Sequence, residues 1–496
     1  MKKIFKKAAI ALAAALSFAT VISASSCEKT EKKSGEFNEN DIVLSFSAMS
    51  DVHQQVGQEK VKDKLVNALN YAEELAGGKL DVALFAGDLT EDTWKKTGLE
   101  GQSNYTTEYN ADIEMLKTAI TEGVNIGETG VFYSLGNHDT DPSVLGDVMK
   151  EMPALFYSQL GEEFFRIDSA DSRPAEGLRH AEVNGYHFLA VNPAKYWTLQ
   201  GYEQSTLEWL DEKLSEITAA EPDKYVFVTA HPPVYETVNG SSATSWGDSD
   251  ISEVISKYPQ VVYFSGHIHN VLQDETQISQ NGKFTALDCG SVKYTGWMNN
   301  VNDNLLRFDN DIGTRIDDFS EGLLVQADGN GNLRVKRCDY VNRSVIKTAW
   351  ELSYPQSDNS HLLKYDNDER KANNAAPVFG NDAALNVSIA DGEISCEWQA
   401  ASDDDMVRYY LLTVYNVSGT KKTKVKTFYL ATFTYRYDSA ADMPDTESWK
   451  FTVSDMEKYC KTCKTEYTGE FYFELCAVDV WFARSEAITF SYSANQ

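Results

Sequence analysis

Short apolar runs alternate with longer amphipathic segments from residue 41 to about residue 260. Each run is almost entirely apolar, which is typical of strands that are buried on both faces. The runs read IVLSFSAMS, LDVALFA, GVFYSL, KYVFVTA and VVYFS. Between them, apolar residues recur at helical spacing in two sets: Val61, Leu65, Leu69, Ala72 and Leu75, and Leu207, Leu210, Leu214 and Ile217. This alternation predicts an α/β domain.

The helical pattern ends after Phe264, and short strand-like runs follow one another to about Tyr340. They read KFTALDCGS, GLLVQAD and NLRVKRCDY, and the turn Asp328-Gly329-Asn330-Gly331 predicts a hairpin between the last two. We therefore expect a domain over residues 41–350 whose sheet finishes with antiparallel strands and whose helices cover its outer faces. Residues 351–376 are polar and lack apolar periodicity, so we expect a linker there.

Seven strand-like runs separated by turns fill the rest of the chain, residues 377–496. They are ALNVSIA, EISCEWQ, VRYYLLTVY, KVKTFYLATFTYRY, SWKFTV, GEFYFELCAVD and EAITFSYS. This pattern predicts a small all-β sandwich of immunoglobulin type. More specifically, the region resembles a fibronectin type III domain, through Trp398 in the second run, Tyr409 and Tyr410 in the third, and the run that begins at Tyr472. We interpret it as a spacer or an accessory module.

The first 26 residues have the form of an export signal, with four early lysines followed by an apolar stretch and then small residues. The run Ala24-Ser25-Ser26-Cys27 resembles the cleavage box of bacterial lipoproteins, although Ala24 stands where leucine is most common. We expect residues 1–26 to be a lipoprotein signal peptide and 27–40 a flexible tether, which would anchor an exported protein to a membrane through Cys27. The alternative is a plain secretory signal.

Charge and cysteine content add two expectations. The formal net charge is -30, which disfavours binding to a nucleic-acid polymer or an anionic membrane surface. Besides Cys27 there are six cysteines. Cys396 with Cys476, or Cys460 with Cys463, could form a disulfide in an exported protein, and free buried thiols are the alternative. The sequence does not predict the oligomeric state.

Five clusters of Asp, Asn and His residues each follow a predicted strand. They are Asp51-Val52-His53, Gly87-Asp88, Gly136-Asn137-His138-Asp139, His231 and Gly266-His267-Ile268-His269. The clusters hold five of the eight histidines of the chain. Because ligands of α/β sheets bind where strands end, these donors should converge on one crevice. Oxygen and nitrogen donors in this number predict a two-metal hydrolytic site. No role is assigned to His180, His187 or His361.

Taken in order, the five clusters resemble the pattern of the calcineurin-like metallophosphoesterase superfamily, over roughly residues 41–340. The resemblance implies a four-layer α/β/β/α sandwich. It also implies two ligand sets, with Asp88 bridging both ions. Asp51, His53, Asp88 and His269 would hold the first ion, and Asp88, Asn137, His231 and His267 the second. His138 would donate a proton or hydrogen bond to the leaving oxygen, and Asp139 would hold its ring.

These expectations define a phosphoester hydrolase with two divalent or trivalent transition-metal ions, for which the ligand types suit Mn, Fe or Zn. A hydroxide bridging the metals would attack phosphorus in line. Residues 89–92, LTED, resemble the cyclic-nucleotide phosphodiesterase branch more than purple acid phosphatases, so a phosphodiester or nucleotide substrate is favoured. A phosphomonoesterase and a non-catalytic surface-binding lipoprotein are the alternatives. Loop aromatics either stack on a base or pack the loops: Trp94, Tyr196, Trp197, Trp246, Tyr294 and Trp297.

Overall fold

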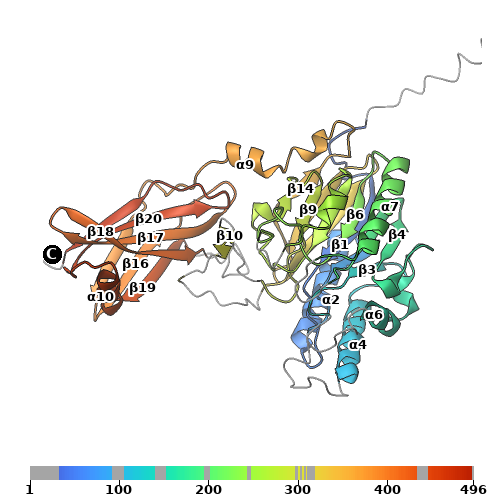
Figure 1. Ribbon diagram of the computed structural model, residues 1–496, viewed down its shortest axis with the longest axis horizontal. Coiled ribbons are helices and arrows are strands. Elements are labelled where there is room, and N and C mark those ends of the chain that lie inside the picture. The colour runs from blue at the N-terminus through green and yellow to red at the C-terminus, as the bar shows by residue number, and fades with distance from the viewer. Residues whose placement is uncertain are drawn as a thin grey trace, which may run out of the picture. The chain divides into compact units, whose positions relative to one another are not determined.

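The structure is a computed structural model, drawn in Figure 1. It describes residues 33–91, 105–139, 152–194, 201–242, 247–295, 300–301, 304–305, 309, 319–432 and 445–493. The expected signal peptide, Cys27 and residues 27–32 of the expected tether lie outside this part of the chain. Residues Phe37–Gln496 form one compact unit.

The first sheet contains six strands in the order β14-β13-β12-β1-β2-β3. Their bounds are β1 Ile42–Met49, β2 Val82–Ala86, β3 Gly130–Ser134, β12 Glu321–Asp328, β13 Leu333–Asp339 and β14 Ser344–Leu352. β1, β2 and β3 are parallel, whereas β12 pairs antiparallel with β1 and starts an antiparallel run through β13 and β14. The expected change from parallel to antiparallel pairing is confirmed.

The second sheet also has six strands, in the order β4-β5-β6-β7-β9-β8. Their bounds are β4 Arg179–Val183, β5 Tyr186–Ala190, β6 Val226–Thr229, β7 Val261–Ser265, β8 Ile278–Ser279 and β9 Thr285–Asp288. β5, β6, β7 and β9 are parallel neighbours. Apolar runs predicted β6, β7 and β9 of this sheet but not β4, β5 or β8.

Three apolar cores hold the sheets and helices together. Alternate residues of both sheets share the central core, where the Phe46 ring lies 5.2 Å from Phe188 and 4.8 Å from Phe227 between ring centroids. Helices pack on the other face of each sheet. The first sheet is covered by α2 Glu59–Leu75, α4 Tyr105–Gly123 and α6 Met152–Leu160, and the second by α7 Gln204–Ala220 and α8 Ser252–Ile255. Shorter 3-10 helices are η2 Glu162–Phe165, η3 Pro174–Glu176, η4 Glu275–Gln277 and η5 Ser360–Leu362.

The expected linker packs on the first domain rather than lying free. After β14 the chain forms η5 and then α9, Asn367–Asn373. Tyr365, between them, is 7% exposed and belongs to the core shared by the two sheets. Its hydroxyl accepts a hydrogen bond from the backbone N–H of Glu351. The buried Tyr365 side chain therefore attaches this segment to the first domain, although the segment is mostly polar.

The C-terminal region is a β domain with two antiparallel sheets. One sheet has the order β15-β16-β19, and the other β18-β17-β20-β21. The bounds are β15 Leu385–Ala390, β16 Glu393–Gln399, β17 Val407–Ser418, β18 Lys421–Ala431, β19 Thr446–Thr452, β20 Glu470–Asp479 and β21 Ile488–Ser493. Both sheets contribute to one core, where Trp398 packs 5.4 Å from Tyr410. All seven strands match the predicted runs.

The sequence patterns missed one helix in this domain, α10 Val453–Thr462. Thr452 caps it, because its side chain accepts from the backbone N–H of Asp455 while the Asp455 carboxylate accepts from the Thr452 backbone. Cys460 lies on α10 and Cys463 directly after it. The six cysteines that the structure describes are all free thiols. Cys396 and Cys460 are buried as in the alternative of free buried thiols, whereas Cys476 is half-buried and Cys463 is exposed.

The structure also contains two short strands outside these sheets. β10 Asn300–Val301 and β11 Asn304–Leu305 pair with each other in a two-stranded ladder. Within the described part of the chain, no helix combines the length and apolar character needed to cross a bilayer.

Candidate metal centre

The five predicted clusters lie where parallel strands of the two sheets end. Asp51 follows β1, Asp88 follows β2 and the cluster at Asn137 follows β3, all in the first sheet. His231 follows β6 and His267 follows β7 in the second sheet. The packing of the two sheets therefore brings the five clusters together, as expected for ligand sites at strand ends.

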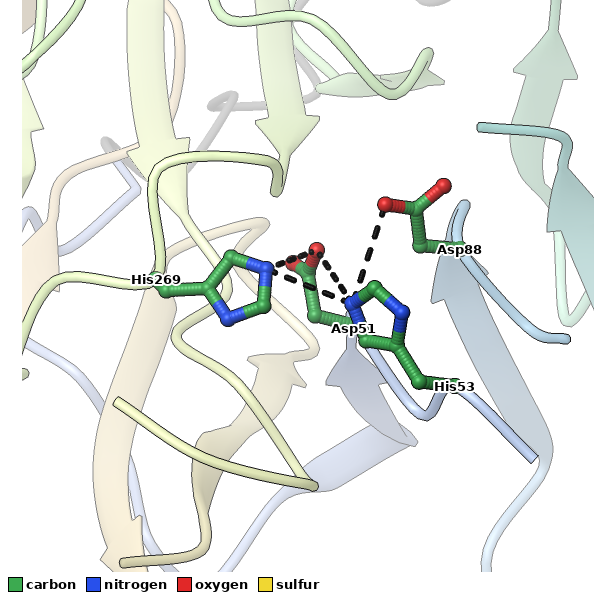
Figure 2. Close-up of side chains that lie close together, drawn as sticks. All are labelled: Asp51, His53, Asp88 and His269. Atoms are coloured by element: carbon green, nitrogen blue, oxygen red, sulfur yellow. Dashed lines mark hydrogen bonds and ion pairs between the residues drawn. The ribbon is translucent and has the colours of Figure 1, made fainter. Parts of the chain in front are cut away.

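The first group of side chains is Asp51, His53, Asp88 and His269 (Figure 2). The ligating atoms of these four residues all lie within 4.8 Å of one another. Asp51 Oδ1 is 2.8 Å from His269 Nε2 and 3.7 Å from His53 Nε2. His53 Nε2 is also 3.8 Å from Asp88 Oδ2. This convergence of two carboxylates and two imidazoles is a metal-binding arrangement.

A second group joins Asp88 to His231 and His267. His231 Nε2 lies 3.1 Å from Asp88 Oδ2, the same oxygen that faces His53 in the first group. A methyl group on Gly136 would lie 2.1 Å from Asp88 Oδ1 and 2.7 Å from the His231 ring, so the turn that carries Asn137 touches this group. Asp88 is thus shared by two sets of donors.

Several donor atoms at the centre are buried and make no hydrogen bond of ordinary geometry among the described residues, although two of them lie close to histidine nitrogens. They are Asp51 Oδ1, Asp88 Oδ2, Asn137 Oδ1 and His231 Nε2. Buried polar atoms are nearly always satisfied, because an unsatisfied one carries a large desolvation cost. Four of them pointing into one site fit metal ions as the missing partners.

The remaining polar atoms of the ligands are tied to the protein. His231 Nδ1 donates to the Ala86 carbonyl at 2.7 Å, and His269 Nδ1 donates to the Tyr294 carbonyl at 3.0 Å. Both bonds leave Nε2 facing the centre. Asp51 Oδ2 accepts from the backbone N–H of His267 at 3.0 Å. Such outer contacts fix ring orientation and tautomer, which is how proteins hold metal ligands in place.

The backbone of the ligand loops is strained. Five expected ligands have left-handed φ angles between 48° and 73°: Asp51, His53, Asp88, His267 and His269. This conformation is uncommon for residues other than glycine and clusters at functional sites. Asp51 and His53 therefore do not lie on one face of an extended segment. Tight loops, rather than strand alternation, aim both side chains at the centre.

Glycines of the motifs allow these loops to approach one another. A methyl group on Gly87 would lie 2.5 Å from His231 Nδ1, and one on Gly266 would lie 1.7 Å from Ser50 Oγ. Gly87 therefore makes room for the His231 ring.

Histidines around the two central carboxylates favour their charged forms. Burial opposes ionisation of Asp51, but His269 and His53 hold the pKa of its carboxyl well below the usual range. Burial likewise opposes ionisation of Asp88, and His231 and His138 lower its pKa. Burial acts against the charge of His231 too, yet the Asp88 carboxylate raises the pKa of that imidazole to about 9. The centre keeps its carboxylates anionic and ready to receive cations.

A carboxylate that the sequence reasoning did not select, Glu91, lies beside the His138 ring. Its Oε1 is 3.5 Å from His138 Nδ1, and its Oε2 is 3.7 Å from His53 Nδ1. Glu91 is buried, and although burial opposes its charge, His138, His53 and Lys293 lower its pKa. The feature of the sequence that could have identified Glu91 is its position three residues after Asp88.

Asp139 does not hold the His138 ring as we expected. Its Oδ1 accepts from the backbone N–H of Thr90 at 2.7 Å and from Thr90 Oγ1 at 2.9 Å, and its Oδ2 accepts from the Gly136 N–H at 2.8 Å. Both oxygens thus tie together the loops after β2 and β3. Burial, and next the charge of Asp88, raise the pKa of Asp139 to about 6. Its role is to hold the loops, and Glu91 is the carboxylate facing the imidazole.

Lys293 and Tyr294, which come after β9, complete the surroundings, and of the two only Tyr294 was considered from the sequence. Lys293 is buried, and its Nζ lies 2.6 Å from Glu91 Oε2. Tyr294 stacks on His269 with 4.3 Å between ring centroids, so it supports a ligand. The other loop aromatics considered as stacking partners lie outside the described residues: Trp94, Tyr196, Trp197, Trp246 and Trp297.

Comparison with known proteins agrees with this geometry. Residues 44–271 match the family model described as calcineurin-like phosphoesterase. This part of the chain is a calcineurin-like phosphoesterase domain. The match ends two residues after His269, so it contains both donor groups. The family indicates a metal-dependent phosphoesterase, a hydrolase, and the Asp and His cluster of the phosphoesterase domain has the donors to hold metal.

Comparisons of the whole chain add no argument. No curated protein matches it. Similar solved structures include the Clostridium perfringens spore cortex lytic enzyme SleM, with 11% identity, 92% of this chain and 99% of that chain covered, and a TM-score of 0.18. Another is chitinase ChiA74 from Bacillus thuringiensis, with 10% identity, coverage of 86% and 67%, and a TM-score of 0.19.

Proposed function

We propose that the protein is a dinuclear-metal phosphoester hydrolase that favours phosphodiester or nucleotide substrates. The observation that carries the proposal is the position of Asp88, whose Oδ2 faces His53 in one donor group and His231 in the other. A carboxylate shared in this way can bridge two cations, which is the arrangement of two-metal hydrolases. Asp51, His53 and His269 would complete one site, and Asn137, His231 and His267 the other.

When bound, the two ions would supply a hydroxide nucleophile near neutral pH and positive charge for the phosphoryl oxygens. The protein supplies the rest. Hydrogen bonds from His231 Nδ1 and His269 Nδ1 to backbone carbonyls aim both rings inwards. The Asp88 carboxylate keeps its position because its Oδ1 accepts from the His138 backbone N–H at 2.8 Å. Rigid donors of this kind stabilise charge without having to reorganise.

His138 is the proton donor for the leaving oxygen in this proposal. Its ring is partly exposed, with 22% of the side chain accessible, whereas His53 and His231 are fully buried. Only an accessible imidazole can reach a substrate. Glu91 orients the ring, and Lys293 holds Glu91 on its other oxygen. A carboxylate beside an imidazole favours the charged form of the ring, which is the form that donates a proton.

The test is metal analysis of a chain spanning residues 28–496, run with hydrolysis of bis-p-nitrophenyl phosphate and p-nitrophenyl phosphate. We expect two ions per chain of Mn, Fe or Zn and faster turnover of the diester. Asp88→Asn should lose both ions and turnover while still folding. Asp211→Asn is the matched control, since Asp211 pairs with Lys257 on an exposed surface.

The outcomes separate the alternatives. Faster turnover of the monoester would make the protein a phosphomonoesterase. Absence of bound metal, with no turnover after addition of Mn, Fe or Zn, would contradict the proposal and favour a non-catalytic surface-binding lipoprotein. One ion per chain with full activity would contradict the dinuclear part alone.

We further propose that the protein is exported and anchored in the cell envelope through a lipidated Cys27, with no nucleic-acid polymer as partner. The support is the form of residues 1–27 and the net charge of -30. Metabolic labelling with a palmitate analogue should mark the wild-type protein and not Cys27→Ala. An unlabelled wild-type protein in the culture medium would indicate a plain secretory signal.

We also propose that the C-terminal β domain has a fibronectin type III-like arrangement, because it consists of seven strands in two antiparallel sheets.

A further inference from the structure

The segment that follows the metal-binding histidines is held from two sides. Residues 270–277 begin directly after His269 and end in η4. From the phosphoesterase domain, Glu321 Oε2 accepts the backbone N–H of Leu272 at 2.7 Å. From the C-terminal β domain, Arg408 Nη2 donates to Asp274 Oδ2 at 2.6 Å and to Thr276 Oγ1 at 3.1 Å. The β domain therefore binds the segment that immediately continues the metal-binding loop.

The pair of Arg408 and Asp274 is completely withdrawn from solvent. The side chains are 1% and 0% exposed, respectively. Asp274 also caps η4, because its Oδ1 accepts from the backbone N–H of Thr276 at 2.8 Å. Charges lose most of their hydration when buried, so they are found buried only where fixed partners replace the water. A module on a loose tether would keep such a pair in water.

An apolar cluster surrounds the same contact. Val271 and Phe319 come from the phosphoesterase side, and the β domain contributes the remaining members, Met406, Ala431, Val480 and Trp481. Every member is at most 6% exposed. Val271 lies only two residues after His269, so apolar packing with the β domain reaches the edge of the metal-binding loop. Burial of these side chains favours the docked arrangement by the hydrophobic effect.

Helix α9, in the segment that precedes the β domain, adds contacts to η4 and to the β domain. The Arg370 guanidinium donates to the Glu275 carbonyl at 2.8 Å and to the Ile278 carbonyl at 2.6 Å. The same guanidinium stacks on Trp481, 4.8 Å from the ring centroid. One side chain thus joins η4 to the β domain. These bonds satisfy backbone carbonyls at both ends of η4 and hold its position.

A further contact of the β domain is made by Asp309. Its backbone N–H donates to the Tyr429 carbonyl in β18 at 2.7 Å, and its Oδ2 accepts from the Tyr429 N–H at 2.8 Å. Lys426 Nζ lies 2.8 Å from its Oδ1. The β domain is therefore in contact with residues 270–277 and with Asp309.

We propose that the C-terminal β domain is a docked support for the metal-binding loop, acting through Arg408 on Asp274 and through the apolar cluster on Val271. Arg408 and Asp274 are positioning residues in this role. The inference revises the interpretation of the β domain as a spacer. It rests on the proposed function only where metal affinity is concerned, because the docking itself is independent of catalysis.

The experiment compares three full-length variants by hydrogen exchange of residues 266–277 without metal, and by Mn²⁺ titration. Arg408→Met removes the charge but keeps most of the length. Arg408→Lys tests rescue by a conservative change. Arg484→Met is the matched control, because Arg484 is an exposed arginine of the same domain. We expect faster exchange of residues 266–277 and a roughly tenfold loss of Mn²⁺ affinity in Arg408→Met, partial rescue in Arg408→Lys and no change in the control.

Unchanged exchange of residues 266–277 in Arg408→Met would overturn the proposal, and so would equal changes in Arg484→Met. If Arg408→Met does not fold, Asp274→Asn provides the same comparison with almost no change in shape. A wild-type protein that binds no Mn²⁺ would contradict the proposed function, while the exchange result would still decide whether the β domain supports the loop.

Discussion

Glu91 Oε1 lies 3.5 Å from Nδ1 of His138, and Glu91 directly follows Thr90, to which Asp139 is hydrogen-bonded, in the loop after β2. The loop after β2 therefore supplies both the shared ligand Asp88 and the carboxylate that orients the proton donor. Since Asp88 and Glu91 are three residues apart on one tight loop, any shift of this loop changes metal binding and proton donation together.

Replacing Glu91 by glutamine should lower kcat about a hundredfold or more, because the His138 ring loses the negative charge that favours its protonated form. KM and bound metal should change little. The matched control is Asp171→Asn, since Asp171 faces His180 at 2.8 Å in a carboxylate–histidine pair outside the metal centre. Steady-state kinetics with metal analysis checks this, and a kcat equal to wild type would contradict the role of Glu91.

Asp139→Asn should act mainly on stability. In the asparagine variant an NH2 group replaces one carboxylate oxygen of residue 139. This new donor would face another donor, either the Gly136 N–H or the N–H and hydroxyl of Thr90. A buried donor left without a partner costs about 1–3 kcal/mol of the free energy of unfolding. We expect a lower unfolding temperature and a smaller loss of kcat than in Glu91→Gln. The reverse order of kcat would show that Asp139 acts on His138 after all.

Gly136→Ala should reduce metal affinity, because the added methyl group would lie 2.1 Å from Asp88 Oδ1 and force the shared ligand to move. Gly380→Ala is the control, since a methyl group there meets no atom within 4 Å. Titration with Mn²⁺ or Zn²⁺ measures both variants. Equal affinities would show that the loop tolerates a side chain at residue 136.

Glu321→Gln should change how stability depends on pH. Burial raises the pKa of Glu321 to about 8 from a usual 4.5. Between these values the unfolded chain loses the proton while the folded protein keeps it, so the free energy of unfolding falls as pH rises from 4.5 and levels off above about 8. Glutamine has no proton to lose, and the Gln273 amide can turn over to accept from it.

The unfolding temperature of Glu321→Gln relative to wild type should therefore increase with pH. Thermal melts near pH 5 and near pH 8.5 measure this difference. A relative unfolding temperature that stays constant or falls with pH would contradict the neutral state of Glu321.

The free thiols predict that reductant has no effect on stability. Alkylation of the unfolded mature chain should label Cys289, Cys338, Cys396, Cys460, Cys463 and Cys476 without prior reduction. The unfolding temperature should be the same with and without dithiothreitol. A missing pair of labels, or a lower unfolding temperature in reductant, would indicate a disulfide.

The sequence by itself determined the local elements and the set of metal-binding donors. Apolar runs predicted eight of the twelve strands in the two six-stranded sheets, and all seven strands of the β domain overlap predicted runs, because burial on one or both faces produces a periodic apolar pattern in the sequence. Asp51, Asp88, His231 and His269 could be identified because each directly follows such a run. These features depend on short-range order along the chain.

Only the tertiary structure decided which groups each carboxylate contacts. Asp139 is adjacent to His138 in sequence, yet a tight turn directs its oxygens to the backbone of Thr90 and Gly136, while Glu91 reaches the imidazole from the loop after β2. The burial of Lys293 beside Glu91 and of Arg408 beside Asp274 likewise joins residues far apart in the chain. Such contacts depend on how sheets and domains pack, which local periodicity does not encode.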